Sequence, residues 1–261
     1  MIKGKHILVI VLCVYLLNAC TPNTLSDIPE DDKSTQQENQ KGNIDEVLHG
    51  VSVDMFLEDV HPLSDGYMEI YRRNETDIYC AYFSESEGEI VVQYSKDNGG
   101  KWERASIPYQ EYQYGIYKIY LSFVDENIGY LLYCGEPACG LMNEVLFKTS
   151  DGGRTFVEAT DISNQIVDYP SDMEFLSEDI GFITMSYHGN APIVYQSNDG
   201  GITWEKQSIA LPQTEFAYAQ GHRMSKSENG AVEIVIELET HTGENKYVTY
   251  YTEDGVAWKM K

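Results

Sequence analysis

Four short segments of one pattern recur along this chain, about fifty residues apart, and they constrain its fold more than any other feature. They are SKDNGGKW from Ser95, TSDGGRTF from Thr149, SNDGGITW from Ser197 and the shortened TEDGVAW from Thr252. Each contains a hydroxyl residue, then an aspartate, a glycine and an aromatic residue. Solenoid repeats and propeller blades have periods of this length, so the sequence predicts a repeat protein.

The chemistry of each segment is that of a tight hairpin turn. An aspartate accepts hydrogen bonds from backbone amides a few residues on, and glycine adopts the positive φ that such a turn needs. The aromatic ring is large enough to fill the hydrophobic layer beneath the turn. Because the turn satisfies its own aspartate, we expect these residues to be structural and not catalytic: Ser95, Asp97, Gly99, Trp102, Thr149, Asp151, Gly153, Phe156, Ser197, Asp199, Gly201, Trp204, Thr252, Asp254, Gly255 and Trp258.

These segments resemble the Asp-box, or bacterial neuraminidase repeat, of sialidase-like β-propellers. The resemblance implies that the boxes lie on the rim of a propeller, away from its ligand face. The region from about Val51 to the end is also similar to photosystem-assembly and stress-type propellers, which bind other proteins and catalyse nothing. The likeness therefore implies a fold more firmly than a role, because propellers host unrelated functions.

The sequence between the boxes repeats as well. SFVDENIGY (Ser122–Tyr130) precedes the second box and EFLSEDIGF (Glu174–Phe182) precedes the third, and both read as a strand, a polar turn and a new strand. We find no helical period after the first twenty residues. The sequence thus predicts an all-β fold, a small β-propeller of four-stranded blades with Asp-box hairpins. Four units are evident; Val51–Glu58 is either the remnant of a fifth blade or an extra strand that pairs with the last blade.

The third strand of each unit is expected to run into its Asp-box turn. These strands are predicted at Ile90–Tyr94, Val145–Lys148, Ile193–Gln196 and Tyr247–Tyr251.

The N-terminus predicts export. Lys3 and Lys5 precede an apolar run that is too short to span a bilayer, and the run ends in Leu-Asn-Ala-Cys at Cys20. Residues 1–19 therefore read as a signal peptide, and the last four residues of the run resemble a bacterial lipobox with Cys20 as the lipid acceptor. Residues 20–45 are polar and read as a disordered tether, followed by the propeller over 46–261. The expected location is the outer surface of the bacterial cytoplasmic membrane or another extracytoplasmic membrane face, with the lipid as the only membrane contact.

The formal net charge of −24 limits the partners. Such a surface repels phosphate backbones, so we expect no nucleic acid. Solubility of an exported protein explains the charge, and an acidic docking face is the alternative. The D-N-G-G turns lack the ligand set of a calcium loop. We expect a monomer without a metal or other cofactor, and cationic partners or divalent metal held loosely between carboxylates are the alternative.

The cysteines of the predicted propeller are Cys80, Cys134 and Cys139. Cys134 and Cys139 flank a short loop, and export permits a disulfide between them. Two inert thiols are the alternative, and the pair alone is poor evidence for zinc. Cys80 alternates with Ile78 and Tyr82 on a predicted strand, so it is expected to be a buried free thiol.

Sialidase activity is not expected from these residues. The family clamps the sialic acid carboxylate with three arginines and uses a tyrosine activated by a glutamate together with an aspartate. Arg104 and Arg154 belong to box hairpins, and the adjacent Arg72 and Arg73 point to opposite faces of a strand. At most one of these two can therefore join Arg223 in a central pocket, so a clamp of three arginines is not evident.

Exposed tyrosines are the best candidates for recognition. Tyrosine gives a large contact area with a polar tip, although it also fills half-buried strand positions. The candidate binding surface consists of Tyr109, Tyr112, Tyr114, His188 and Arg223. The sequence thus predicts a non-catalytic binding or assembly module for an envelope protein, and a glycan-binding or glycoside-hydrolysing propeller is the alternative.

Overall fold

The structure, a computed structural model, describes residues 68–84, 87–108, 115–138, 142–186, 189–212 and 216–261. The chain divides into two units, Met1–Asn43 and Ile44–Lys261, and every described residue belongs to the second. These residues form strands and no helix, which confirms the predicted all-β class. In the described ranges there is accordingly no helix that could span a membrane. The predicted signal peptide, Cys20 and the tether lie outside the described residues and stay predictions.

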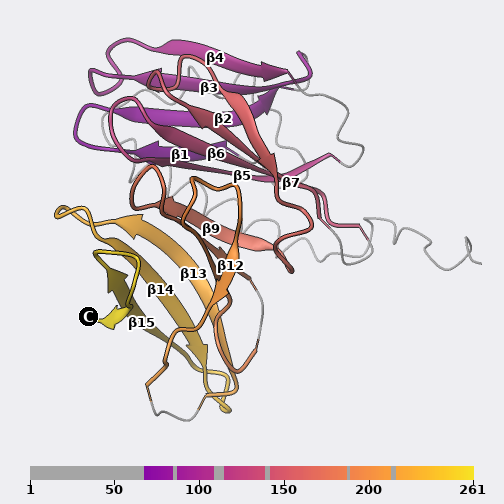
Figure 1. The fold of residues 1–261 in the computed structure, drawn as a ribbon, viewed down its shortest axis with the longest axis vertical. Coiled ribbons are helices and arrows are strands. Elements are labelled where there is room, and N and C mark those ends of the chain that lie inside the picture. The colour runs from indigo at the N-terminus through magenta and orange to yellow at the C-terminus, as the bar shows by residue number, and fades with distance from the viewer. Residues whose placement is uncertain (1–67, 85–86, 109–114, 139–141, 187–188, 213–215) are drawn as a thin grey trace, which may run out of the picture. The chain divides into compact units, whose positions relative to one another are not determined.

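The strands form four antiparallel sheets of four consecutive strands each, as far as the chain is described (Figure 1). We call them blades 1 to 4. Blade 1 consists of β1 (Met68–Arg72), β2 (Ile78–Ser84), β3 (Glu89–Ser95) and β4 (Glu103–Pro108), and blade 2 of β5 (Ile116–Phe123), β6 (Gly129–Gly135), β7 (Glu144–Thr149) and β8 (Val157–Asp161). Blade 3 consists of β9 (Pro170–Phe175), β10 (Gly181–Met185), β11 (Val194–Ser197) and β12 (Glu205–Gln207). Blade 4 consists of β13 (Tyr218–Lys226), β14 (Val232–Glu239), β15 (Asn245–Thr252) and β16 (Lys259–Met260). These meanders are the predicted propeller blades.

The four predicted third strands coincide with β3, β7, β11 and β15. Each runs into its Asp-box, which forms the turn to the fourth strand. The first strands of consecutive blades contact one another: β5 contacts β1, β9 contacts β5, and β13 contacts β9. The first strands therefore form the centre of the arrangement.

The Asp-box of blade 3 shows how the turn is built. The Ser197 hydroxyl donates to Asp199 Oδ1 at 2.9 Å and accepts from the Gly201 amide at 2.8 Å, while Asp199 Oδ1 also accepts from the Thr203 amide at 2.8 Å. The bonds from Thr203 and Ser197 hold the Asp199 pKa below its ordinary value. Gly201 has a φ of 87°, and a Cβ there would lie 2.2 Å from a methyl of Leu146. Glycine is therefore required by both conformation and space.

The other three boxes repeat this arrangement. In the boxes that start at Ser95 and Thr149, the hydroxyl accepts the amide four residues on at 2.8 and 2.9 Å. In the shortened last box, Thr252 Oγ1 accepts the Gly255 amide, three residues on, at 3.0 Å. The shortened box thus keeps the hydroxyl–amide hydrogen bond although it has one residue fewer.

Replacing Asp199 with alanine is expected to lower the free energy of unfolding by about 1–2 kcal/mol, because the Thr203 amide and hydroxyl lose their acceptor. Urea denaturation followed by tryptophan fluorescence measures this. Glu205→Ala, an exposed site with the same charge change, is the control. Equal effects of the two substitutions would contradict a structural role for the box.

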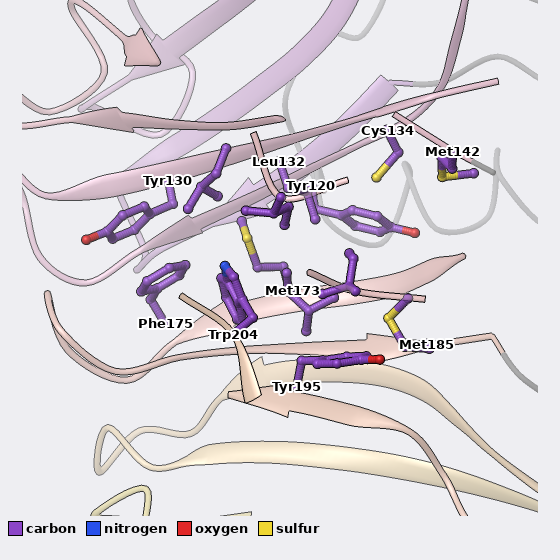
Figure 2. Packing of buried hydrophobic residues seen from close by; sticks show 14 of the residues in the cluster. Tyr120, Tyr130, Leu132, Cys134, Met142, Met173, Phe175, Met185, Tyr195 and Trp204 are labelled. Atoms are coloured by element: carbon purple, nitrogen blue, oxygen red, sulfur yellow. The ribbon is translucent and has the colours of Figure 1, made fainter. Parts of the chain in front are cut away.

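Blades 2 and 3 are joined by a stack of aromatic rings. Phe175, at the end of β9, stacks on Tyr130 of β6 with ring centroids 3.6 Å apart and meets Trp204 edge-on at 6.1 Å (Figure 2). Phe175 also covers Gly181 of its own blade, where a Cβ would lie 2.5 Å from the Phe175 ring. This contact explains why glycine opens the second strand.

Blades 1 and 2 are joined in the same way. Phe123, at the end of β5, stacks on Tyr79 of β2 with ring centroids 3.7 Å apart. It also covers Gly129, where an added Cβ would lie 2.5 Å from the Phe123 ring. The repeated Gly-aromatic element of the sequence is therefore the contact between blades.

Candidate functional site

A buried carboxylate lies where three blades meet. Glu174, on β9, is 2% exposed. Its Oε1 accepts a hydrogen bond from Ser122 Oγ of β5 at 2.5 Å and one from the Tyr71 hydroxyl of β1 at 3.3 Å. Ser122 Oγ in turn accepts the Phe175 amide at 2.8 Å. One side chain of blade 3 thus connects to blades 1 and 2.

A second carboxylate on the same strand ties in blade 4. Asp172 is two residues before Glu174, so both project from one face of β9. Its Oδ2 accepts the Met224 amide of β13 at 2.7 Å, and its Oδ1 accepts the Met173 amide at 2.8 Å. Lys226, at the end of β13, donates to the Phe123 carbonyl of β5 at 3.3 Å. We call Tyr71, Ser122, Asp172, Glu174 and Lys226 the central network.

Burial governs the acidity of the central network. It raises the pKa of Glu174 to about 7, with the Lys226 charge opposing the rise, and it raises that of Asp172 to about 6. Burial and the neighbouring Asp172 charge raise the pKa of Glu69, on β1. Burial lowers the pKa of Lys226, with Glu174 opposing, and burial followed by the Glu174 charge raises that of Tyr71. The centre therefore favours the neutral forms of its groups.

The residue types of the central network include the tyrosine, glutamate and aspartate that a sialidase would use. The electrostatics differ from those of a nucleophile, however. The pKa of Tyr71 is raised, whereas an activated tyrosine needs a lowered one. Oε1 of Glu174 also accepts from donors on two neighbouring strands, and Asp172 accepts from the Met224 amide of β13 and from the Met173 amide of its own strand. This arrangement is that of a structural tie.

Four of the five arginines contact residues at the Asp-box end or on the surface. Arg72 donates to the Glu75 carbonyl and to Asn98, and Arg73 pairs with Asp77. Arg104 pairs with Glu87, and Arg154 donates to the Asp151 carbonyl.

The predicted binding surface is described only at Arg223. This residue is exposed on β13, and its charge lowers the pKa of Asp172 slightly against the effect of burial. Tyr109, Tyr112, Tyr114 and His188 lie outside the described residues. The strands that they connect, β4 to β5 and β10 to β11, join at the ends remote from the Asp-box turns. The surface as a whole stays a prediction.

The described cysteines are free thiols. Cys80 is 2% exposed, as the strand alternation predicts, and Cys134 is fully buried. Burial raises the pKa of both thiols, so both are unreactive in the folded protein. The free Cys134 thiol is in keeping with the alternative of two inert thiols; Cys139 lies outside the described residues, and the Cys134–Cys139 disulfide is not part of the described structure. No three metal-ligating side chains gather anywhere in the described ranges.

A polar cluster covers part of the outward face of blade 4. Glu237, on β14, accepts hydrogen bonds from Gln220 at 2.9 Å, Asn245 at 2.5 Å and the Tyr247 hydroxyl at 3.2 Å. His222, at a bulge in β13, lies 3.8 Å from the same carboxylate, and its ring is 5.7 Å from that of Tyr247. Tyr247 is 56% exposed. An accessible ring therefore lies beside several polar side chains.

Sequence reasoning missed the central network and the way in which Glu237 gathers this polar cluster. A signal for the first was present, because Ser122 and Glu174 open the two repeated segments SFVDENIGY and EFLSEDIGF. Equivalent positions of successive repeats lie next to one another at the centre of a propeller. The cluster of blade 4 has no such signal, because a bulge places His222 there.

No family model and no curated protein matches this sequence. Solved structures do match. The α-L-arabinanase of Penicillium chrysogenum, solved with arabinobiose, has a TM-score of 0.51 at 16% identity over 74% of this chain and 65% of its own. The Hadza microbial sialidase Hz136 has a TM-score of 0.49 at 16% identity over 74% of this chain and 45% of its own. An Aleuria aurantia lectin bound to α-methyl-L-fucoside has a TM-score of 0.45 at 9% identity over 74% of this chain and 58% of its own.

The arabinanase match shows that the fold is of the propeller type found in glycoside hydrolases. The chain spans less than two thirds of the length of each of these three proteins. At such identities the likeness is one of fold, and function is argued from the residues of this chain.

Proposed function

We propose that this protein is a non-catalytic binding propeller, anchored through lipidated Cys20 on the outer face of the cytoplasmic membrane. Its partner is an envelope protein, bound at the end of the blades remote from the Asp-box turns. The observation that carries the non-catalytic assignment is the central network. Glu174 and Asp172 hold blades together through hydrogen bonds to Tyr71, Ser122 and the Met224 amide. Oε1 of Glu174 and both oxygens of Asp172 are thus engaged by the protein itself.

The absence of catalysis is tested with fluorogenic sialosides and arabinosides. The mature chain is expected to give no turnover above buffer. Two variants accompany it: Glu174→Gln, which removes the central charge, and Glu205→Gln, which removes an exposed one. Turnover that is abolished only in Glu174→Gln would contradict the proposal, because the carboxylate would then act on a substrate.

The binding role is tested by pull-down from envelope extract with the mature chain carrying Cys20→Ser. We expect a stoichiometric protein that remains bound at high salt if the contact is apolar, and one that is lost at high salt if the acidic surface carries it. Tyr112→Ala and Tyr114→Ala are expected to weaken capture at least fivefold, and Tyr251→Ala, in blade 4, serves as the control. Capture that is insensitive to the first two substitutions would contradict the surface.

Glycan binding is a second candidate, favoured by the polar cluster of blade 4. An exposed tyrosine beside glutamate, glutamine, asparagine and histidine offers a flat apolar face and several hydrogen-bonding groups, the combination that sugars require. Tyr247→Ala is expected to abolish binding on a glycan array, whereas Tyr218→Ala, at the edge of the same sheet, serves as the control. Equal binding by both variants would contradict this site.

A further inference from the structure

One face of blade 1 is buried, although no other described blade packs on it. We call this the outer face of blade 1, and it contains Cys80, Tyr82 and Val91, which are 2%, 3% and 0% exposed. The hydrophobic side chains that pack with them are Met68, Ile70 and Trp102, all from blade 1 itself.

The opposite face of blade 1 belongs to the contact with blade 2. Tyr79, Ala81 and Val92 lie there, in one cluster with residues of β5, β6 and β7 such as Ile119 and Leu131. Because successive residues of a strand alternate between faces, Cys80 and Tyr82 point away from blade 2. A single sheet does not bury both of its faces by itself, so a further layer must cover the outer face.

Blade 4 is not suited to be that layer. The face of blade 4 that points away from blade 3 has Glu233, Glu237 and Tyr247 on it, and Tyr247 is 56% exposed. Its apolar residues, such as Ile234 and Ile236, pack on the other side. Val235 is on this face too, but its neighbours are mainly polar or charged, so the face is a poor hydrophobic complement to Cys80, Tyr82 and Val91.

The chain just before β1 has the pattern of a suitable cover. In VSVDMFLE, from Val51 to Glu58, apolar residues stand at every second position (Val51, Val53, Met55 and Leu57), and of the intervening residues only Phe56 is apolar. This is the alternation of a strand with one buried face. About ten residues separate it from Met68, enough to reach any part of the adjoining sheet at roughly 3.3 Å per residue. The segment itself lies outside the described residues.

We propose that Val51–Glu58 lies as a strand on the outer face of blade 1, with Val51, Val53, Met55 and Leu57 against Cys80, Tyr82 and Val91. The segment then covers blade 1 as a partial fifth blade and does not pair with the last blade.

Cys80 reports on this contact. The full chain is treated with N-ethylmaleimide under native conditions, and labelling at each cysteine is followed by mass spectrometry. Val53→Asp is expected to raise the labelling rate of Cys80 at least tenfold, because it places a charge against the buried face. Ser52→Asp, one residue away on the other side of the strand, is the matched control and leaves the rate unchanged. Cys134, buried between blades 2 and 3, stays unlabelled in both.

Three results would overturn the proposal. The first is that Cys80 is labelled at the same rate in the wild type and in Val53→Asp. The second is that Val53→Asp and Ser52→Asp raise the Cys80 labelling rate equally. The third is that Cys80 of the wild type becomes labelled when the protein is diluted, which would identify a second copy of the chain as the cover.

If Val53→Asp exposes Cys134 as well, the variant unfolds, and a second measurement decides. A protease site is inserted after Ser64 in the full chain, and the folded protein is cut there. The proposal requires that the fragment containing Val51–Glu58 co-elutes with the blades and that Cys80 stays protected. Release of the fragment with Cys80 still protected would overturn it.

Discussion

Replacing Phe175 with alanine is expected to lower the free energy of unfolding by about 3–5 kcal/mol, the largest effect of any single substitution considered for this chain. Phe175 is fully buried, stacks on Tyr130 and meets Trp204 edge-on. Its removal leaves a cavity at the junction of blades 2 and 3 as well as losing these contacts. Urea denaturation of the wild type and the variant measures the loss. Val157→Ala, at a site 64% exposed, is the control, with an expected change below about 0.5 kcal/mol.

A double-mutant cycle with Gly181 tests whether the Phe175 ring itself fills the space above Gly181 or whether any substitution in this region destabilises the fold. In the wild type, Gly181→Ala is expected to cost about 1–3 kcal/mol, because the new methyl would lie 2.5 Å from the Phe175 ring. In the Phe175→Ala background that ring is absent, so the same substitution is expected to cost much less. Additive losses would show that the ring does not occupy the space above Gly181.

Acidification from pH 8 to pH 5 is expected to stabilise the protein, and Glu174→Gln is expected to remove part of this effect. The folded pKa of Glu174 is raised from its ordinary value of 4.5 to about 7, so the folded state binds a proton more tightly than the unfolded chain. The stability from this proton is fully present below about pH 4.5 and is lost as the pH rises through 7. Protonation of Asp172 also stabilises the folded state: its pKa is raised from 3.8 to about 6, so this stability is lost as the pH rises through about 6. For Glu174 the change is on the order of 2–3 kcal/mol.

The measurement is the free energy of unfolding at pH 5, 6, 7 and 8. Glutamine keeps an acceptor for Ser122 and Tyr71, so Glu174→Gln is expected to be as stable as the wild type near pH 5 and more stable at pH 8. Because the net charge of −24 also favours unfolding at high pH, Glu205→Gln is the control for a lost surface charge. A Glu174→Gln curve that runs parallel to the wild type would contradict a protonated Glu174.

The fold was predictable because the turns are specified locally. Asp199, Gly201 and their equivalents fix each hairpin within eight residues, and hydrophobic alternation fixes the strand that precedes it. The positions of β3, β7, β11 and β15 followed from these two signals. The four described blades match the four boxes, because each described blade contains one. The boxes do not decide whether Val51–Glu58 belongs to a fifth blade, because that segment contains no box.

The centre was not predictable in the same way. The chain has 42 acidic residues, and nothing local distinguishes Glu174 or Asp172 from those on the surface. Their burial arises because first strands of different blades converge, which is a property of the whole arrangement. Comparison of equivalent repeat positions would have paired Ser122 with Glu174, whereas Tyr71 lies outside both segments and carries no such signal.

Two hydrogen bonds of the central network join blades that do not follow one another in the chain. Tyr71 of blade 1 reaches Glu174 of blade 3, and Lys226 of blade 4 reaches the Phe123 carbonyl of blade 2. A duplication that inserted a new blade between these partners would separate them and leave buried polar groups without partners. A blade gained at either terminus would leave both bonds intact. Growth of this protein by repeat duplication is thus restricted to its ends.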